Sequence, residues 1–178
     1  IVDPENQIME SDESNNRHST IVGGLGLQDT DDDNIPNYIE DSTCTESDDA
    51  DSDDDGILDG FEDINHDGVV DSDETDPCDP DTDHDGIQAG TELGLDETDI
   101  GPDTDSMVFI PDEDKSSTTD PLVADSDGDT YTDGEEDING NGRIDIGESD
   151  PNSDTSIPVP SIMTSEITEI TSSSAVSG

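Results

Sequence analysis

The chain has 178 residues, of which 53 are acidic and only 3 are lysine or arginine, so its formal charge is −50. Apolar residues make up 25% and aromatic residues 2%, too few for the core and cavity that a small-molecule enzyme needs. Three basic side chains cannot form a nucleic-acid-binding patch. No apolar run reaches the length of a membrane-spanning helix. Composition alone predicts disorder, so the order of the acidic residues decides the interpretation.

The N-terminal segment, 1–28, lies outside the regular acidic pattern that follows. We expect it to be extended, with a candidate strand over 19–27, where the sequence reads STIVGGLGL.

Six twelve-residue segments then share one spacing. Oxygen-bearing side chains stand at positions 1, 3, 5, 9 and 12, and a turn residue stands at position 6. The segments are 29–40, 51–62, 63–74, 81–92, 125–136 and 137–148. The predicted metal ligands at this spacing are Asp29, Asp31, Asp33, Asn37, Glu40, Asp51, Asp53, Asp55, Asp59, Glu62, Asp63, Asn65, Asp67, Asp71, Glu74, Asp81, Asp83, Asp85, Glu92, Asp125, Asp127, Asp129, Asp133, Glu136, Asp137, Asn139, Asn141, Asp145 and Glu148.

This spacing is the one that calcium-binding loops use. Calcium takes six to eight oxygen ligands, so positions 1, 3 and 5 point inward, position 7 contributes its carbonyl and the glutamate at position 12 contributes two oxygens. We expect about six or more Ca²⁺ ions per chain. His66 and His84 stand at position 4, where we expect the side chain to face solvent.

Three positions depart from the pattern. Asn34 and Thr130 replace the glycine at position 6, and Ala89 replaces the oxygen ligand at position 9. Asparagine tolerates the positive φ of this turn and threonine does so poorly, so the turn at Thr130 is expected to be distorted. A short Thr/Ser-Asp-Pro motif also recurs, at 75–77, 119–121 and 149–151.

The loops are not EF-hands, because segments 51–62 and 63–74 abut and leave no room for flanking helices. We therefore predict a mostly irregular fold. It would be an elongated, solenoid-like array of calcium loops with a few short β-strands.

The insertion at 93–118 interrupts the array. We expect one short strand, Met107–Ile110, together with one irregular ion site; the alternative is a solvated acidic loop. The C-terminal segment, 155–178, is rich in Ser and Thr. It is either an extended segment able to pair with a neighbour or a linker, which O-glycosylation would suit.

Cys44 and Cys78 are the two cysteines, and they flank the first tandem pair of loops. An even count in a chain of secreted character favours one disulfide between them. The alternatives are two free thiols or bonds between chains.

The runs DSDDDGILDGFEDINHDGVVDSDETDPCDPDTDHDG (51–86) and TTDPLVADSDGDTYTDGEEDINGNGRIDIGESDP (118–151) resemble thrombospondin type 3 repeats in their bacterial form. The resemblance covers 29–154. It implies an extracellular or cell-surface location and a calcium-cored, rod-like array that collapses without calcium.

On these grounds we expect a structural protein and not an enzyme. Extended end segments can add a strand to a neighbour, so the expected partners are copies of the chain itself in a surface filament. The alternatives are a stalk or linker of a secreted or cell-surface adhesin, and a calcium buffer. Nucleic acid, small-molecule substrates and membrane insertion are not expected.

Overall fold

The computed structural model describes residues 28–159. The candidate strand at 19–27 and most of the C-terminal segment lie outside these residues. We number the twelve-residue segments in chain order as loop 1 (29–40), loop 2 (51–62), loop 3 (63–74), loop 4 (81–92), loop 5 (125–136) and loop 6 (137–148).

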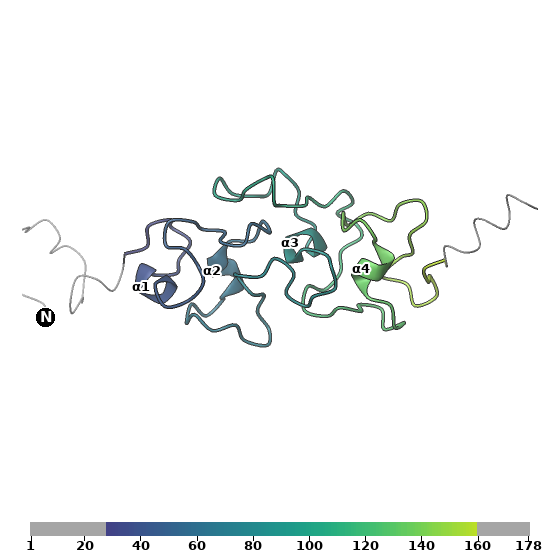
Figure 1. Ribbon diagram of the computed structural model, residues 1–178, viewed down its shortest axis with the longest axis horizontal. Coiled ribbons are helices and arrows are strands. Elements are labelled where there is room, and N and C mark those ends of the chain that lie inside the picture. The colour runs from purple at the N-terminus through teal and green to yellow at the C-terminus, as the bar shows by residue number, and fades with distance from the viewer. Residues whose placement is uncertain (1–27, 160–178) are drawn as a thin grey trace, which may run out of the picture.

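Four single helical turns are the regular elements of the described chain. They are α1 (Asn37–Glu40), α2 (Asp59–Glu62), α3 (Ala89–Glu92) and α4 (Asp133–Glu136). Each occupies positions 9–12 of a loop, in loops 1, 2, 4 and 5. We call these four the main loops and call loops 3 and 6 the side loops. The four turns follow one another in chain order along the longest axis of the molecule (Figure 1).

The expectation of a mostly irregular fold without EF-hand helices agrees with this arrangement. The expectation of short β-strands does not hold between residues 28 and 159, where β pairing is limited to two isolated bridges, Glu46 with Asp49 and Ile146 with Glu148. The backbone polar groups are instead satisfied by carboxylates within the loops, which leave few donors for a strand ladder.

The predicted strand at 107–110 is also absent. The chain turns there, because the N–H groups of Val108 and Phe109 both donate to the Asp105 carbonyl, over 2.8 and 3.1 Å. The N–H of Ile110 donates to the side chain of Gln88 at 2.6 Å. Apolar β-branched residues favour a strand only where a partner strand exists, and here the partners are a turn and a side chain.

One set of hydrogen bonds closes every loop. The N–H at position 6 donates to the carboxylate at position 1 over 2.7–3.2 Å in all six loops. The N–H at position 7 donates to the side chain at position 5 over 2.7–3.0 Å. In the main loops, the N–H at position 9 also donates to the carbonyl just before position 1, over 2.8–3.1 Å.

The interior of the described chain is built from carboxylates more than from apolar side chains. The largest fully buried side chains include Glu40, Glu62, Glu92 and Glu136, which are position 12 of the four main loops. The buried apolar residues are Ile35, Ala50, Ile57, Ile87, Ala89 and Phe109. Carboxylates buried in this way are costly unless they are protonated or paired with a cation.

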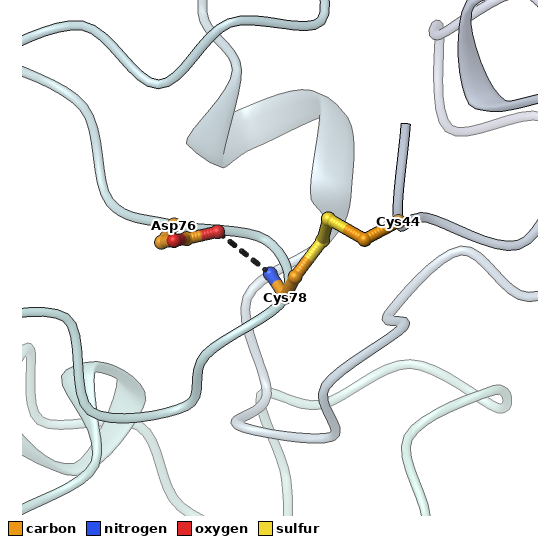
Figure 2. Close-up of side chains that lie close together, drawn as sticks. All are labelled: Cys44, Asp76 and Cys78. Carbon is orange, nitrogen blue, oxygen red and sulfur yellow. Dashed lines mark hydrogen bonds between the residues drawn. A yellow bond between two sulfur atoms is a disulfide. The ribbon is translucent and has the colours of Figure 1, made fainter. Parts of the chain in front are cut away.

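The predicted disulfide is present. Cys44 and Cys78 are bonded within one chain, with Cα atoms 6.0 Å apart and a sequence separation of 34 (Figure 2). The N–H of Cys78 donates to the carboxylate of Asp76 at 3.1 Å, which fixes the turn that carries the second cysteine. Closing a loop of this length stabilises the fold by about 3–4 kcal/mol in the chain-entropy account.

Within residues 28–159, no helix combines the length and the apolar character required to cross a bilayer.

Candidate metal centres

The main loops contact one another through a glycine at position 10. Gly60, Gly90 and Gly134 hold this position in loops 2, 4 and 5. A Cβ atom at any of them would overlap the backbone carbonyl at position 5 of the preceding main loop. The N–H of Gly90 donates to the carboxylate of Asp55 at 3.1 Å, and the N–H of Gly134 donates to that of Asp85 at 2.9 Å. Position 5 therefore faces its own loop and the next one.

Loop 1 buries oxygen atoms from all five of its predicted side-chain ligands. Six of their oxygen atoms are buried and accept no hydrogen bond from any residue in the described range. They are Oδ1 of Asp29, Oδ2 of Asp31, Oδ2 of Asp33, Oδ1 of Asn37 and both carboxylate oxygens of Glu40. Buried oxygens without donors are costly unless a cation satisfies them, and oxygens from these five positions are the set that calcium takes.

The other main loops repeat this arrangement with fewer unsatisfied oxygens. In loops 2 and 5, both oxygens of Glu62 and of Glu136 are buried and accept no hydrogen bond from a described residue. In loop 4, one oxygen of Glu92 is buried and accepts no hydrogen bond from a described residue, whereas the other accepts one from the Thr119 hydroxyl at 2.9 Å. Oxygens at position 3 are unsatisfied in all three loops. The carboxylates of loop 1, loop 2 and loop 4 at positions 1, 3 and 5 lie close enough for a metal ion to touch all three.

Burial makes these carboxyl groups hard to ionise without a cation. Burial, together with the neighbouring carboxylates, raises the pKa of Glu40 to about 8 and that of Glu62 to about 10. Burial likewise raises the pKa of Glu92 to about 9, and that of Asp53 to about 8. A divalent cation among the oxygens would reverse this effect by stabilising the charged form.

The side loops differ, because their carboxylates are satisfied internally. In loop 3, the two oxygens of Glu74 accept from the N–H groups of Asn65 and Asp71, at 3.3 and 2.9 Å. In loop 6, the guanidinium of Arg143 donates to Asp145 at 2.7 Å and also pairs with Glu113. Loops 3 and 6 thus keep the predicted spacing but offer a cation fewer free oxygens than the main loops.

Two groups of residues that complete the loops were not predicted as functional. The first is the serine at position 2 of loops 2 and 5, which holds the side chain at position 9. In loop 2, the Ser52 hydroxyl donates to Asp59 at 2.6 Å, and in loop 5 the Ser126 N–H donates to Asp133 at 3.0 Å. The second is the hydroxyl of the Thr/Ser-Asp-Pro motif, which in Thr119 reaches position 12 of loop 4. Both groups recur along the sequence, and this recurrence could have marked them as functional residues.

The insertion at 93–118 is not simply a solvated acidic loop. The hydroxyl of Thr104 donates to the carboxylate of Asp51 in loop 2, and the N–H of Asp105 donates to Asp54 at 2.6 Å. The ammonium group of Lys115 lies between Asp96 and Asp99 and pairs with both. The insertion therefore braces loops 2 and 4 and neutralises part of its own charge.

The two histidines at position 4 differ in exposure. His84 faces solvent as predicted, whereas His66 is half-buried with its ring 3.1 Å from the Gly60 carbonyl. The pair Cys44 and Cys78, although close to Asp76, is a disulfide and offers no thiolate to a metal.

Comparison of the chain with protein-family models, with curated proteins and with solved structures yields no match.

Proposed function

We propose that the chain is an extracellular structural module whose main loops bind Ca²⁺, and that the bound ions hold it as an elongated, solenoid-like rod. The observation that carries the proposal is the set of buried carboxylate oxygens without donors, which recurs at positions 3 and 12 of all four main loops. Each main loop supplies at least four acidic or amide ligands with a bidentate glutamate, as calcium prefers. Magnesium favours compact octahedral sites that retain several waters.

An extracellular setting is supported by the disulfide, which persists in oxidising compartments. It also follows from the resemblance to thrombospondin type 3 repeats, which rests on the loop sequences. The contacts from one main loop to the next favour a structural role over a buffer of independent sites, because an ion in one loop stabilises the surface on which the next loop packs.

The proposal is tested by calcium titration of the full chain, calorimetrically and by circular dichroism. We expect four ions in the main loops to bind first and to order the chain, with loops 3 and 6 binding more weakly. The variant Glu62→Gln removes a main-loop ligand and should lower the number of tightly bound ions by one. Glu74→Gln, the same change in a side loop, should leave that number unaltered. Fewer than four ions, or equal effects of the two variants, would contradict the proposal.

Self-assembly into a filament remains part of the proposal for the intact protein. Its expected pairing elements, 21–25 and 157–170, lie almost wholly outside the described residues. Deleting 152–178 and imaging the protein in millimolar calcium tests it. Filaments formed only by the full chain would support the filament, and a monomeric rod at high concentration would favour the adhesin stalk.

A further inference from the structure

The side chain at position 9 accepts hydrogen bonds from position 2 in two main loops, loops 2 and 5. The carboxylate of Asp59 is fully buried and accepts from the N–H and the hydroxyl of Ser52, at 2.8 and 2.6 Å. Asp133 is also fully buried, accepts from the Ser126 N–H at 3.0 Å and keeps its Oδ2 without a donor among the described residues. Position 2 therefore fixes where position 9 points.

Asp59 points at the preceding main loop. Its carboxylate forms a group with Asp33 and Glu40 of loop 1, in which one oxygen of each residue lies within 4.8 Å of the others. All three residues are buried. Oδ2 of Asp33 and both oxygens of Glu40 are buried and lack a donor in residues 28–159. A carboxylate of loop 2 thus completes the oxygen cluster of loop 1.

Asp133 stands in the same relation to loop 4. Asp133 directly precedes Gly134, which packs against the Asp85 carbonyl of loop 4 just as Gly60, after Asp59, packs against the Asp33 carbonyl of loop 1. The adjacent Gly134 N–H donates to Asp85 at 2.9 Å, which fixes the distance between the two loops.

The junction between loops 2 and 4 lacks this carboxylate. Position 9 of loop 4 is Ala89, which is fully buried and has no oxygen to offer. The junction carries apolar and amide groups instead. The ring of Phe109 lies where a Cβ on Gly56 would meet it, and Gln88 bonds the backbone at Ile110.

We propose that the carboxylate at position 9 serves the ion of the preceding main loop, so that calcium fills two coupled pairs of sites. Loops 1 and 2 form one pair through Asp59, loops 4 and 5 form the other through Asp133, and Ala89 separates them. This inference rests on the proposed calcium binding and adds how the sites are linked.

Two tyrosines allow each pair to be followed separately. Tyr38 lies in loop 1 and Tyr131 in loop 5, and the chain has no other tyrosine and no tryptophan. Terbium(III), an oxygen-preferring ion that emits when a nearby tyrosine is excited, is the probe. Full-length Tyr131→Phe reports terbium at loop 1, and full-length Tyr38→Phe reports it at loop 5.

The first comparison is Asp59→Asn with Asp71→Asn, the same change at position 9 of side loop 3. Asp59→Asn should weaken terbium binding at loop 1 by about tenfold and leave loop 5 unchanged, and Asp71→Asn should leave both unchanged. An unaltered loop 1, or equal shifts at both reporters, would overturn the inference. Terbium emission that calcium does not displace in the parent chain would contradict the proposed calcium binding itself, so the two failures are distinguishable.

The second comparison introduces a carboxylate at position 9 of loop 4, where the chain has Ala89. In the chain that keeps Ala89, Glu62→Gln should weaken terbium binding at loop 1 by about fivefold or more. Terbium binding at loop 5 should not change. In the Ala89→Asp background, where Thr82 stands at position 2, the same Glu62→Gln change should also shift loop 5. If Glu62→Gln shifts terbium binding at loop 5 while residue 89 is still alanine, the two pairs are not separate and the inference is overturned. Should Ala89→Asp fail to fold, the single variants Asp59→Asn and Glu62→Gln still decide the question.

Discussion

The residue at position 6 of each loop sets the conformational cost of the loop's turn. All six loops have a positive φ there, from 72° at Gly142 to 110° at Gly86. Asn34 adopts 87°, which asparagine accommodates, whereas Thr130 adopts 92° with a β-branched side chain. The turn in loop 5 is nevertheless intact, because the Thr130 N–H still donates to Asp125 at 3.0 Å. The ring of hydrogen bonds within the loop therefore imposes the strain on Thr130.

Relieving this strain should stabilise the protein. We expect Thr130→Gly to raise the free energy of unfolding in saturating calcium by about 1 kcal/mol, the cost of the left-handed region for an L-residue. The matched control is Gly86→Thr at position 6 of loop 4, where an added Cβ meets nothing within 4 Å. It should destabilise by a similar amount through the backbone alone. Both are measured from denaturant midpoints. Destabilisation by Thr130→Gly would show that the threonine side chain contributes more than the turn costs.

At the scale of elements, the contact that joins the main loops depends on the absence of a side chain at position 10. Glycine holds this position in loops 2, 4 and 5. Where no preceding main loop packs, larger residues occur: Tyr38 in loop 1 is 53% exposed, and Ile146 in loop 6 is fully exposed. Glycine at position 10 thus marks the loops that pack on a preceding main loop, namely loops 2, 4 and 5.

Gly90→Ala tests this contact. The added methyl group would overlap the Asp55 carbonyl, so loops 2 and 4 must separate. We expect a loss of about 1–3 kcal/mol in the free energy of unfolding, as for other overpacked sites. Gly101→Ala is the control, since its nearest neighbour is a leucine methyl at 3.5 Å, and it should change stability by less than about 0.5 kcal/mol. Equal effects of the two variants would mean that the contact between loops contributes little.

The spacing of ligands within a loop could be predicted from the sequence, because a twelve-residue calcium loop is a local structure. Positions 1, 3, 5 and 12 of loop 1 converge as expected, and the turn at position 6 forms in every loop. The relation between loops could not be predicted in the same way. Asp59 and Asp71 both stand at position 9, yet one is buried against loop 1 and the other bonds the Asn65 amide at 3.0 Å. That difference depends on which loops pack together, and only the glycine at position 10 signalled it.

For the whole molecule, charge and burial act against each other. The formal charge is −50, and many of these charges lie in the interior as carboxylates of the main loops. The six buried apolar residues found between residues 28 and 159 cannot offset the mutual repulsion of these carboxylates. The disulfide encloses only loops 2 and 3, and the insertion contacts loops 2, 4 and 6. Four divalent ions would lower the formal charge only to −42, so the effect of calcium on the fold comes from where the ions bind and not from net neutralisation.

Removal of calcium should therefore expand the whole chain. In excess chelator, we expect the radius of gyration from small-angle scattering to rise toward roughly 45 Å, the value for an unfolded chain of this length, with the disulfide keeping it somewhat below that value. Calcium should restore the compact dimensions, whereas magnesium at the same concentration should not, because it binds irregular, carboxylate-rich loops poorly. Sodium chloride at matched ionic strength controls for screening, which acts between exposed charges and much less on buried ones. Dimensions that stay unchanged in chelator, or that recover equally in sodium chloride, would mean that the buried carboxylates are stabilised by something other than bound calcium.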